Sequence, residues 1–530
     1  MLLLVALSAI LIPLVLLVLL RMPARYSMPI AALSVALLGA TAWEMEGLVL
    51  LASGLQGLHR ALTIIWILCG AIFLLYVVEK TGALDRIKQG FFTISKDMRV
   101  QTVLIAFAFV AIIEGVSGFG TPAAMAVPLL VALGFHPMTA VILALVGDSV
   151  PTSFGALGTP LLVGLSNVAD PNGTLVGEVA TKIALIDSLY GLLLPLVLVT
   201  ILVVAFGRKR ERTRDIVEII PWSLLVGASY VATTLMSVLW LRLEFAAVLG
   251  GVVALLVGTI TAHRGVLQPK AVWRHHITDE VKEVAHEKPT MSLVKAWFPY
   301  GLAITLLLLQ RLVPAVRDVS QTLADASWQA ILGIETISSQ WQVLYSPGTV
   351  LLVSALVTAL LFRDRLKTVL VAGSQMIRKV APTALALGST LVMVQIFANS
   401  GTNESGLSSM PVYIAETLAY TLGPIWLAVA PFLGTIAAFI MGSSTVSTLT
   451  MSPVQYSVAV DLNIPVDVAL AQQVSGANAG NSIAVHNVVA ASAVAGLHHQ
   501  EGRIIRHTLL PVLLYVICSI LMTLVVLAVV

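Results

Sequence analysis

Residues 112–122 read IIEGVSGFGTP and separate two apolar runs, LIAFAFVA before them and AAMAVPLLVAL after them. Inside a bilayer a chain must satisfy its own backbone hydrogen bonds, and a carboxylate at the bilayer centre costs about 3 kcal/mol on insertion scales. Glycine further weakens the interior of a helix. One acid, Glu114, and three glycines at this point therefore predict a membrane helix that is broken for a functional reason.

The composition indicates that these runs lie in a membrane. The chain of 530 residues is 58% hydrophobic and 11% charged, with a mean hydropathy of +0.97. Stretches such as 2–20, 183–206 and 508–530 have the length of about 20 apolar residues that spans a hydrocarbon core as a helix. They are too continuous for the alternating strands of a membrane barrel. We therefore predict an all-α polytopic membrane protein, and we expect the first run to be a retained helix and not a signal peptide.

Lysine and arginine are concentrated in a few connecting segments, which the positive-inside rule places in the cytoplasm. Threading the chain from the first of these segments puts both termini outside and gives a long external loop at 312–346. Each segment is short and lies between membrane spans, so nucleic-acid binding is not expected. The basic segments are 79–99, 207–215, 263–288, 362–367 with 378–379, and 498–507.

Two regions without any lysine or arginine, 100–181 and 400–502, share one pattern. Each has a break rich in small and hydroxyl residues, an apolar stretch, a turn with proline, a second apolar stretch and a second break. EGVSGFGTP and GDSVPTSFGALGTP in the first region correspond to GSSTVST and SGANAGN in the second. The flanking charges indicate that the two regions run in opposite directions through the membrane.

Inverted repeats with paired helix breaks are typical of secondary transporters, whose substrate site lies near the midplane among the ends of half-helices. The alternative is that glycine and serine only allow helices to pack closely. Their clustering at four breaks favours a polar site.

A broken helix exposes backbone N–H groups at one half-helix end and carbonyl groups at the other, and these attract anions and cations respectively. Because neither region contains lysine or arginine, only these dipoles and nearby hydroxyl and amide groups could hold an anion. This favours a small, weakly charged anion over a phosphate or a dicarboxylate. The predicted substrate-binding residues are Gly118, Phe119, Gly120, Thr121, Thr152, Ser153, Gly155, Ser443, Ser444, Thr445, Asn478, Asn481, His486 and Asn487.

Two acids, Glu114 and Asp148, lie at the two breaks of the first region. A carboxyl group away from water at mid-membrane can carry a proton during transport, so we predict that both are proton-coupling residues. The alternative is a neutral carboxyl group that only bonds to a loop carbonyl. His486 is a candidate proton relay or substrate ligand, but it could equally be a core histidine whose hydrogen bonds are satisfied.

At these residues the sequence resembles the lactate permease family. EGVSGFGTPAAMAVPLLVALGF is similar to the family's EG-x-x-GFG-x-P segment, and SVPTSFGALGTP is similar to its APVAFGA-x-G-x-P segment. Further similar segments are NSGTNESGLSSM, PFLGTIAAFIMGSSTVST and SGANAGNSIAVHNVVAASAVAG. The likeness covers roughly the whole chain and is strongest over 100–165 and 390–497.

The resemblance implies proton-coupled uptake of lactate, glycolate or a similar small 2-hydroxymonocarboxylate across the cell inner (plasma) membrane. The sequence departs from the best-known lactate carriers at Asp148, where they have Asn, and at Asn481, where they have Lys. Ser444 and Thr448 also stand where those carriers have Asp and Asn. These differences leave the particular carboxylate open.

The resemblance also implies a fold like that of the ion-transporter superfamily, with a scaffold and an elevator-type transport domain. The expected division is 1–99, N-terminal scaffold helices; 100–181, first inverted-repeat transport unit; 182–399, scaffold helices with a cytoplasmic segment at 263–296 and the external loop at 312–346; 400–502, second inverted-repeat transport unit; and 503–530, C-terminal helix.

Two alternatives stay open at this point. A sodium symporter would keep the architecture and place its ion among the carbonyls and hydroxyls of GSSTVST and SGANAGN. A channel or a membrane-embedded enzyme is a different class, but the chain has no HExxH motif and no nucleophile and base at a convincing spacing. We expect no enzymatic activity, no cofactor and no metal; the lipid bilayer is an expected partner, and a homodimer is left open.

Overall fold

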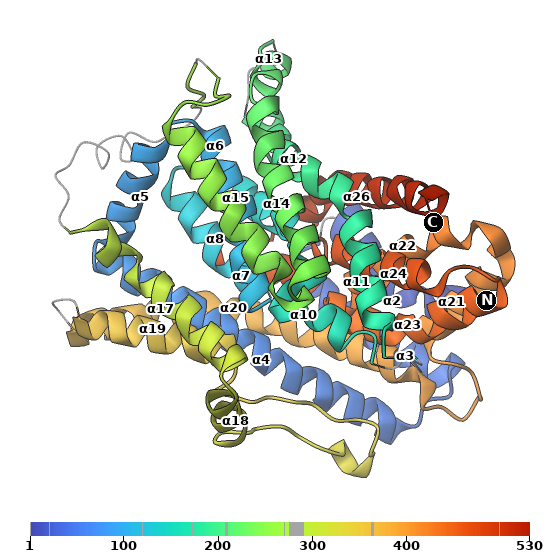
Figure 1. Cartoon of the computed structure of the whole chain (residues 1–530). Coiled ribbons are helices and arrows are strands. Elements are labelled where there is room, and N and C mark those ends of the chain that lie inside the picture. The colour runs from blue at the N-terminus through green and yellow to red at the C-terminus, as the bar shows by residue number, and fades with distance from the viewer. Residues whose placement is uncertain are drawn as a thin grey trace.

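A computed structural model describes residues 2–529 apart from 21, 119, 167, 169, 171–172, 207–209, 270, 275–290, 362–364 and 498. Nearly all of the described chain is helical (Figure 1). Helices that satisfy every backbone hydrogen bond internally are the structures that an apolar chain can use to cross a bilayer. The prediction of an all-α membrane protein is confirmed. Part of the predicted cytoplasmic segment 263–296 lies outside the described residues.

Eight of the described helices are long and apolar enough to cross a membrane, or nine if the bent pair Pro137–Gly147 and Pro151–Leu162 forms one span. The protein is therefore a multi-pass membrane protein. The first apolar run is helical but divided, because Pro13 ends α2 (Ser8–Pro13) and a π-helix follows. The eight are Gly47–Lys80, Met98–Val116, Ser188–Ala205, Arg212–Trp240, Leu243–His263, Leu293–Leu312, Ala384–Gly401 and Glu501–Ala528.

Both predicted regions contain broken helices in the same order of elements. A helix, a break, a second helix, a turn, a third helix and a second break follow one another in each. The first region comprises α7 (Val110–Val116), α8 (Thr121–Ala132), α9 (Pro137–Gly147), a 3-10 turn η3 (Pro151–Phe154) and α10 (Gly155–Leu162). The second comprises α22 (Trp426–Met441), α23 (Ser444–Asp461), α24 (Val466–Asn481) and α25 (Val485–Val494). The opposite orientation of the two regions stays a prediction.

Left-handed backbone conformations occur at three of the four breaks, and the break between α24 and α25 has none. Gly118 and Gly120 have φ of +59° and +78°, and Gly442 has φ of +70°. Glycine adopts these angles without the steric cost that a side chain would add. At the second break of the first region Ala156 and Leu157 also have positive φ, a conformation that is uncommon for residues with a side chain. The glycines identified from the sequence are therefore the points at which the chain changes direction.

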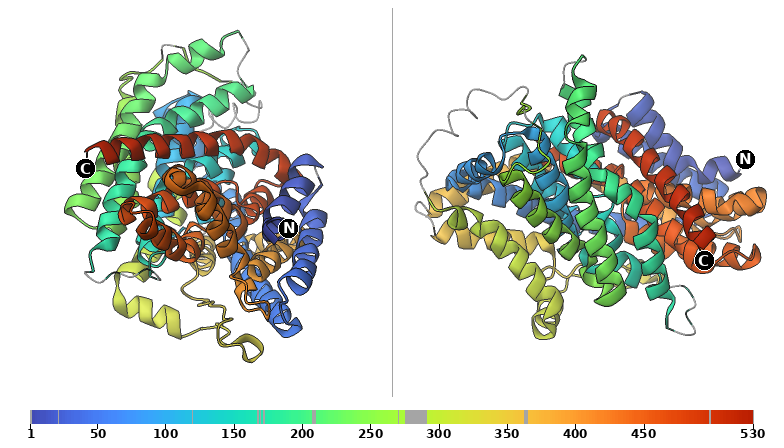
Figure 2. Two further views of the ribbon diagram at one scale, coloured as in Figure 1. Left: turned by 90° about the vertical axis from the view of Figure 1, so that its right-hand side faces the viewer. Right: turned by 45° about the horizontal axis from the view of Figure 1, so that its top comes forward.

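Long helices pack beside the broken regions. α4 (Gly47–Lys80) and α20 (Arg365–Ala398) lie against each other over much of their length, with α19 (Pro347–Leu361) beside them (Figure 1). Gly57 permits this contact, because a Cβ there would lie 2.5 Å from the Cα of Val392. Small residues allow such close approach of membrane helices. Both ends of the chain lie on the right-hand side of Figure 1, and they are well separated from each other in the left view of Figure 2. The prediction that both lie outside the cell is not tested by this arrangement.

The predicted external loop has structure of its own. After α18 (Pro314–Thr322), residues 325–342 form a short hairpin with β-bridges between Asp325 and Gln342 and between Trp328 and Ser339. The hairpin docks on α4 through Gln56, whose Nε2 donates to the carbonyl of Ser338 at 2.7 Å. It is an ordered element fixed to a membrane helix.

A buried ion pair joins the start of α6 (Met98–Thr102) to the segment after α15 (Ala246–His263). Arg99 Nη2 lies 2.6 Å from Asp97 Oδ2. The backbone N–H of Trp273 also donates to Asp97, at 3.1 Å. Because a buried ion pair needs full hydrogen bonding to offset its desolvation, this arrangement fixes the described part of the cytoplasmic segment to the helices.

Candidate functional site

Side chains from the two broken regions meet in one hydrogen-bonded chain. Ser444, the first residue of α23, donates from Oγ to Asn478 Oδ1 on α24 at 2.6 Å. Asn478 Nδ2 in turn lies 2.6 Å from Oγ of Ser153 in η3. All three side chains are buried. The structure therefore brings together three predicted site residues from both regions, although Ser153 and Asn478 are 325 residues apart in sequence.

Asp187 continues this chain. The hydroxyl of Ser153 donates to Asp187 Oδ2, and the hydroxyl of Ser475 on α24 donates to Asp187 Oδ1 at 2.9 Å. Asp187 is only 3% exposed and lies at the junction of α11 (Leu175–Ile186) and α12 (Ser188–Phe206). A buried acid whose two oxygens are held by different regions is a functional candidate, since ionisable residues inside membranes are costly.

Asp187 is not among the predicted site residues, because 183–206 has the composition and length of one plain membrane span. The signal was present: a single acid in the apolar run IALIDSLYGLLLP. An isolated acid inside a predicted span should itself be treated as a candidate site residue.

A second polar group lies where the first break of one region approaches the last break of the other. A Cβ added at Gly120 would lie 3.5 Å from Asn487 Oδ1. Asn487 Nδ2 donates to Asn481 Oδ1 at 2.9 Å and to its backbone carbonyl at 3.0 Å. The N-termini of α8 and α25, which begin here, have no side-chain cap. Uncapped half-helix N-termini are favourable positions for an anion.

Glu114 and Asp148 lie together although they come from the two different breaks of the first region. Both are buried, at 4% and 5% exposure, and their carboxyl groups are close enough to interact. Gly155 makes room for the Glu114 carboxyl group, which a Cβ at that position would overlap. Two buried carboxyl groups this close cannot both carry a charge without strong repulsion. A role of the pair in proton coupling stays a prediction.

Several buried polar atoms at the breaks have no protein partner among the described residues. Buried polar atoms are normally hydrogen-bonded to protein or water, so these atoms are candidates to contact water or a polar ligand. The ring of His486 on α25 lies directly against Gly442, at the break between α22 and α23, since a Cβ added at Gly442 would overlap the ring. The atoms are Thr121 Oγ1, Asp148 Oδ1, Thr448 Oγ1, Ser482 Oγ and His486 Nδ1.

Other predicted site residues are engaged locally. Thr152 donates to the backbone carbonyl of Asp148 at 2.6 Å, and Ser443 caps α23 by accepting from the N–H of Val446 at 3.4 Å. Thr445 is half-buried on α23. Phe119 lies outside the described residues. A role in substrate binding stays a prediction for all of them.

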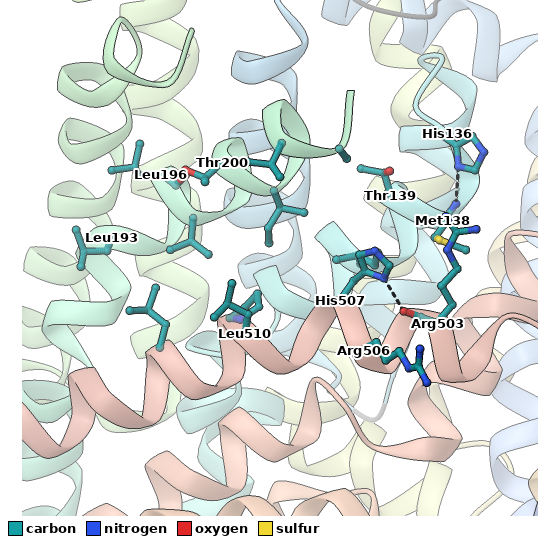
Figure 3. A pocket seen from close by; sticks show the side chains of 17 residues that line it. His136, Met138, Thr139, Leu193, Leu196, Thr200, Arg503, Arg506, His507 and Leu510 are labelled. Atoms are coloured by element: carbon teal, nitrogen blue, oxygen red, sulfur yellow. Dashed lines mark hydrogen bonds between the residues drawn. The ribbon is translucent and has the colours of Figure 1, made fainter. Parts of the chain in front are cut away.

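A large cavity lies elsewhere. It has a volume of about 890 Å³ and lies between α9, α12 and α26 (Glu501–Val529) (Figure 3). Its walls are mainly apolar, and it contains none of the predicted site residues. Volume alone therefore does not identify the polar centre.

The fold and the centre define a polytopic membrane protein in which broken helices enclose a buried polar site. The chain belongs to the L-lactate permease family, whose model matches residues 3–530. It is 32% identical over 481 residues to a Haemophilus influenzae protein named "Putative L-lactate permease", covering 86% of this chain and 85% of that one. It is 26% identical over 522 residues to the L-lactate permease of Bacillus subtilis, covering 91% and 88%. It is 25% identical over 499 residues to glycolate permease GlcA of Escherichia coli, covering 86% and 83%. The resemblance found from the motifs is confirmed.

Proposed function

We propose that the protein is a secondary active transporter that imports lactate, glycolate or a similar small 2-hydroxymonocarboxylate together with a proton. Membership of the family and the names of its relatives support the carboxylate class. Because these relatives are permeases, the proposal does not include an enzymatic reaction. The membrane is the cell inner (plasma) membrane.

The observation that carries the proposal is the meeting of both broken regions at one buried polar centre. The uncapped N-terminus of α25 would hold the substrate carboxylate through backbone N–H groups. At the start of α8 the N–H of Ala123 is the available donor, because Thr121 N–H donates to the carbonyl of Gly118 and Pro122 has no N–H. Asn481 and Asn487, which lie beside Gly120, supply amide groups for the substrate hydroxyl. Since regions 100–181 and 400–502 contain no lysine or arginine, a single negative charge fits this centre better than two.

The acids supply the coupling. The Glu114–Asp148 pair carries the transported proton, because both acids are buried and Glu114 lies against Gly118 and Gly155 at the two breaks. Asp187 links the two regions during transport, because its two oxygens accept hydrogen bonds from Ser153 of the first region and Ser475 of the second. The two regions move together as an elevator-type transport domain against the remaining helices.

Uptake into proteoliposomes tests the proposal. The full-length protein is reconstituted, and labelled L-lactate uptake is measured with an alkaline interior in sodium-free buffer. We expect accumulation above the external concentration, and its loss when a protonophore collapses the pH gradient. Accumulation that requires sodium and is unaffected by the protonophore at fixed voltage would show that the coupling ion is sodium and not a proton. Uptake that never exceeds equilibration would indicate a channel, because passive conduction cannot concentrate a solute.

A further inference from the structure

The large cavity between α9, α12 and α26 has an apolar body. Its walls along the two long helices are aliphatic, and they continue onto surface that faces outward, since Leu510 is 74% exposed and Val204 is 49% exposed. Figure 3 shows Leu193, Leu196 and Leu510 along this part of the cavity. Such a groove in a membrane protein suits a hydrocarbon chain and offers few partners to a small hydroxy acid.

One end of the cavity is basic. His136 at the start of α9 and Arg503, Arg506 and His507 in the first turns of α26 line it, and the lining includes no acidic residue. In Figure 3 these side chains gather at the end of the cavity away from Leu193. Arginine side chains bind phosphate oxygens through charge-assisted hydrogen bonds, so this end suits an anionic phosphate group.

The basic end lies at the cytoplasmic surface predicted from the sequence. Arg503, Arg506 and His507 belong to the basic segment 498–507, and Val204 and Ala205 at the end of α12 directly precede the basic segment 207–215. The cytoplasmic leaflet carries anionic lipids, and basic pockets between membrane helices on this side bind their headgroups. The position, the charge and the apolar body therefore match one kind of molecule.

We propose that this groove binds one anionic phospholipid of the cytoplasmic leaflet. The headgroup phosphate lies at Arg503 and Arg506, and an acyl chain lies along the leucines of α12 and α26. A helix of a second protein copy would fill the apolar body but would not provide an anionic group for the arginines of the basic end. The proposal does not depend on which solute the protein transports.

The test compares the wild type with the double variant R503Q/R506Q. R214Q/R264Q is the matched control, because Arg214 and Arg264 are exposed residues of the predicted cytoplasmic face that do not line the cavity. The purified full-length protein is titrated with phosphatidylglycerol, with phosphatidylcholine, or with inorganic phosphate. Bound lipid is counted by native mass spectrometry, and the melting temperature is measured on the same samples.

We expect phosphatidylglycerol, but neither phosphatidylcholine nor inorganic phosphate, to bind the wild type and the control and to raise their melting temperature. At about 1 kcal/mol for each arginine near an anionic surface, R503Q/R506Q should bind phosphatidylglycerol roughly thirtyfold more weakly. Leu196→Trp, which fills the apolar body and keeps the charges, should also reduce lipid binding. Equal phosphatidylglycerol binding by R503Q/R506Q and the control would overturn the proposal, as would full occupancy by inorganic phosphate alone. A dimer that disappears in Leu196→Trp without any loss of bound lipid would assign the groove to a second copy.

Discussion

Replacing Glu114 by glutamine separates proton coupling from substrate binding. Glutamine has nearly the same shape and can still hydrogen-bond to Asp148, but it cannot gain or lose a proton. If the pair carries one proton with each lactate, a pH difference of one unit supplies about 1.4 kcal/mol, which supports at most about tenfold lactate accumulation in the wild type. In Glu114→Gln we expect accumulation to fall to the external concentration. Exchange of internal for external lactate should survive, because it requires no net proton movement.

The assay uses two measurements on the same proteoliposomes. Uptake of labelled L-lactate under an imposed pH gradient reports accumulation, and counterflow into vesicles loaded with unlabelled lactate reports exchange. Glu178→Gln serves as the control, because Glu178 is an exposed acid on α11. Accumulation equal to that of the control would refute the coupling role of Glu114. Loss of both exchange and accumulation in a correctly folded variant would instead place Glu114 in substrate binding or translocation.

Three further predictions concern other parts of the molecule. Asp187→Asn should slow lactate exchange at least tenfold with little change in melting temperature, because it alters the hydrogen bonds that join the two regions; exchange at the wild-type rate would contradict this. Gly442→Ala should destabilise the protein by about 1–2 kcal/mol, because a left-handed alanine is strained, and should reduce transport by displacing His486. A binding or uptake assay that finds unchanged lactate affinity would show that the His486 ring is not at the site. Arg99→Ala should cost about 3–5 kcal/mol in thermal denaturation, because Asp97 would be left buried without its ion pair; a cost below about 1 kcal/mol would show that water reaches Asp97.

The sequence predicted the helix breaks well because their cause is local. Glycine adopts a left-handed conformation most easily, and Gly118, Gly120 and Gly442 stand at the bends; the left-handed Ala156 and Leu157 could not be predicted in this way. Composition was equally decisive for the all-α membrane fold. The orientation of the two regions, in contrast, was inferred from flanking charges, and its test requires the bilayer as a reference.

The hydrogen-bond partners of individual residues, unlike the helix breaks, could not be predicted from local sequence. Asp187 is bound by Ser153, 34 residues away, and by Ser475, 288 residues away. No periodicity relates such positions, since only the packing of α11 against α24 brings them together. The basic cavity has the same origin, because His136 and Arg503 belong to different regions of the chain and meet only in the folded protein.

The predicted external loop at 312–346 contains structure that its sequence did not predict. Residues 325–342 contain no strand pattern long enough to be recognised, yet they fold onto α4. His59 explains this contact, because its ring nitrogens lie 2.9 Å from Ser339 Oγ and 3.0 Å from the carbonyl of Ala326. Trp328 and Trp341 then pack edge-on against the same ring. An interaction between a helix and a distant hairpin provides the structure that the hairpin's own sequence does not.

The docked hairpin is a suitable epitope for an antibody fragment. Most of a small polytopic protein is hidden by lipid or detergent, which leaves image alignment in electron microscopy with few features to follow. An antibody fragment raised against residues 325–342 in their docked conformation would add a rigid mass fixed to α4. If the hairpin faces outward as the topology predicts, the same reagent would label intact cells and report how much correctly folded protein reaches their surface.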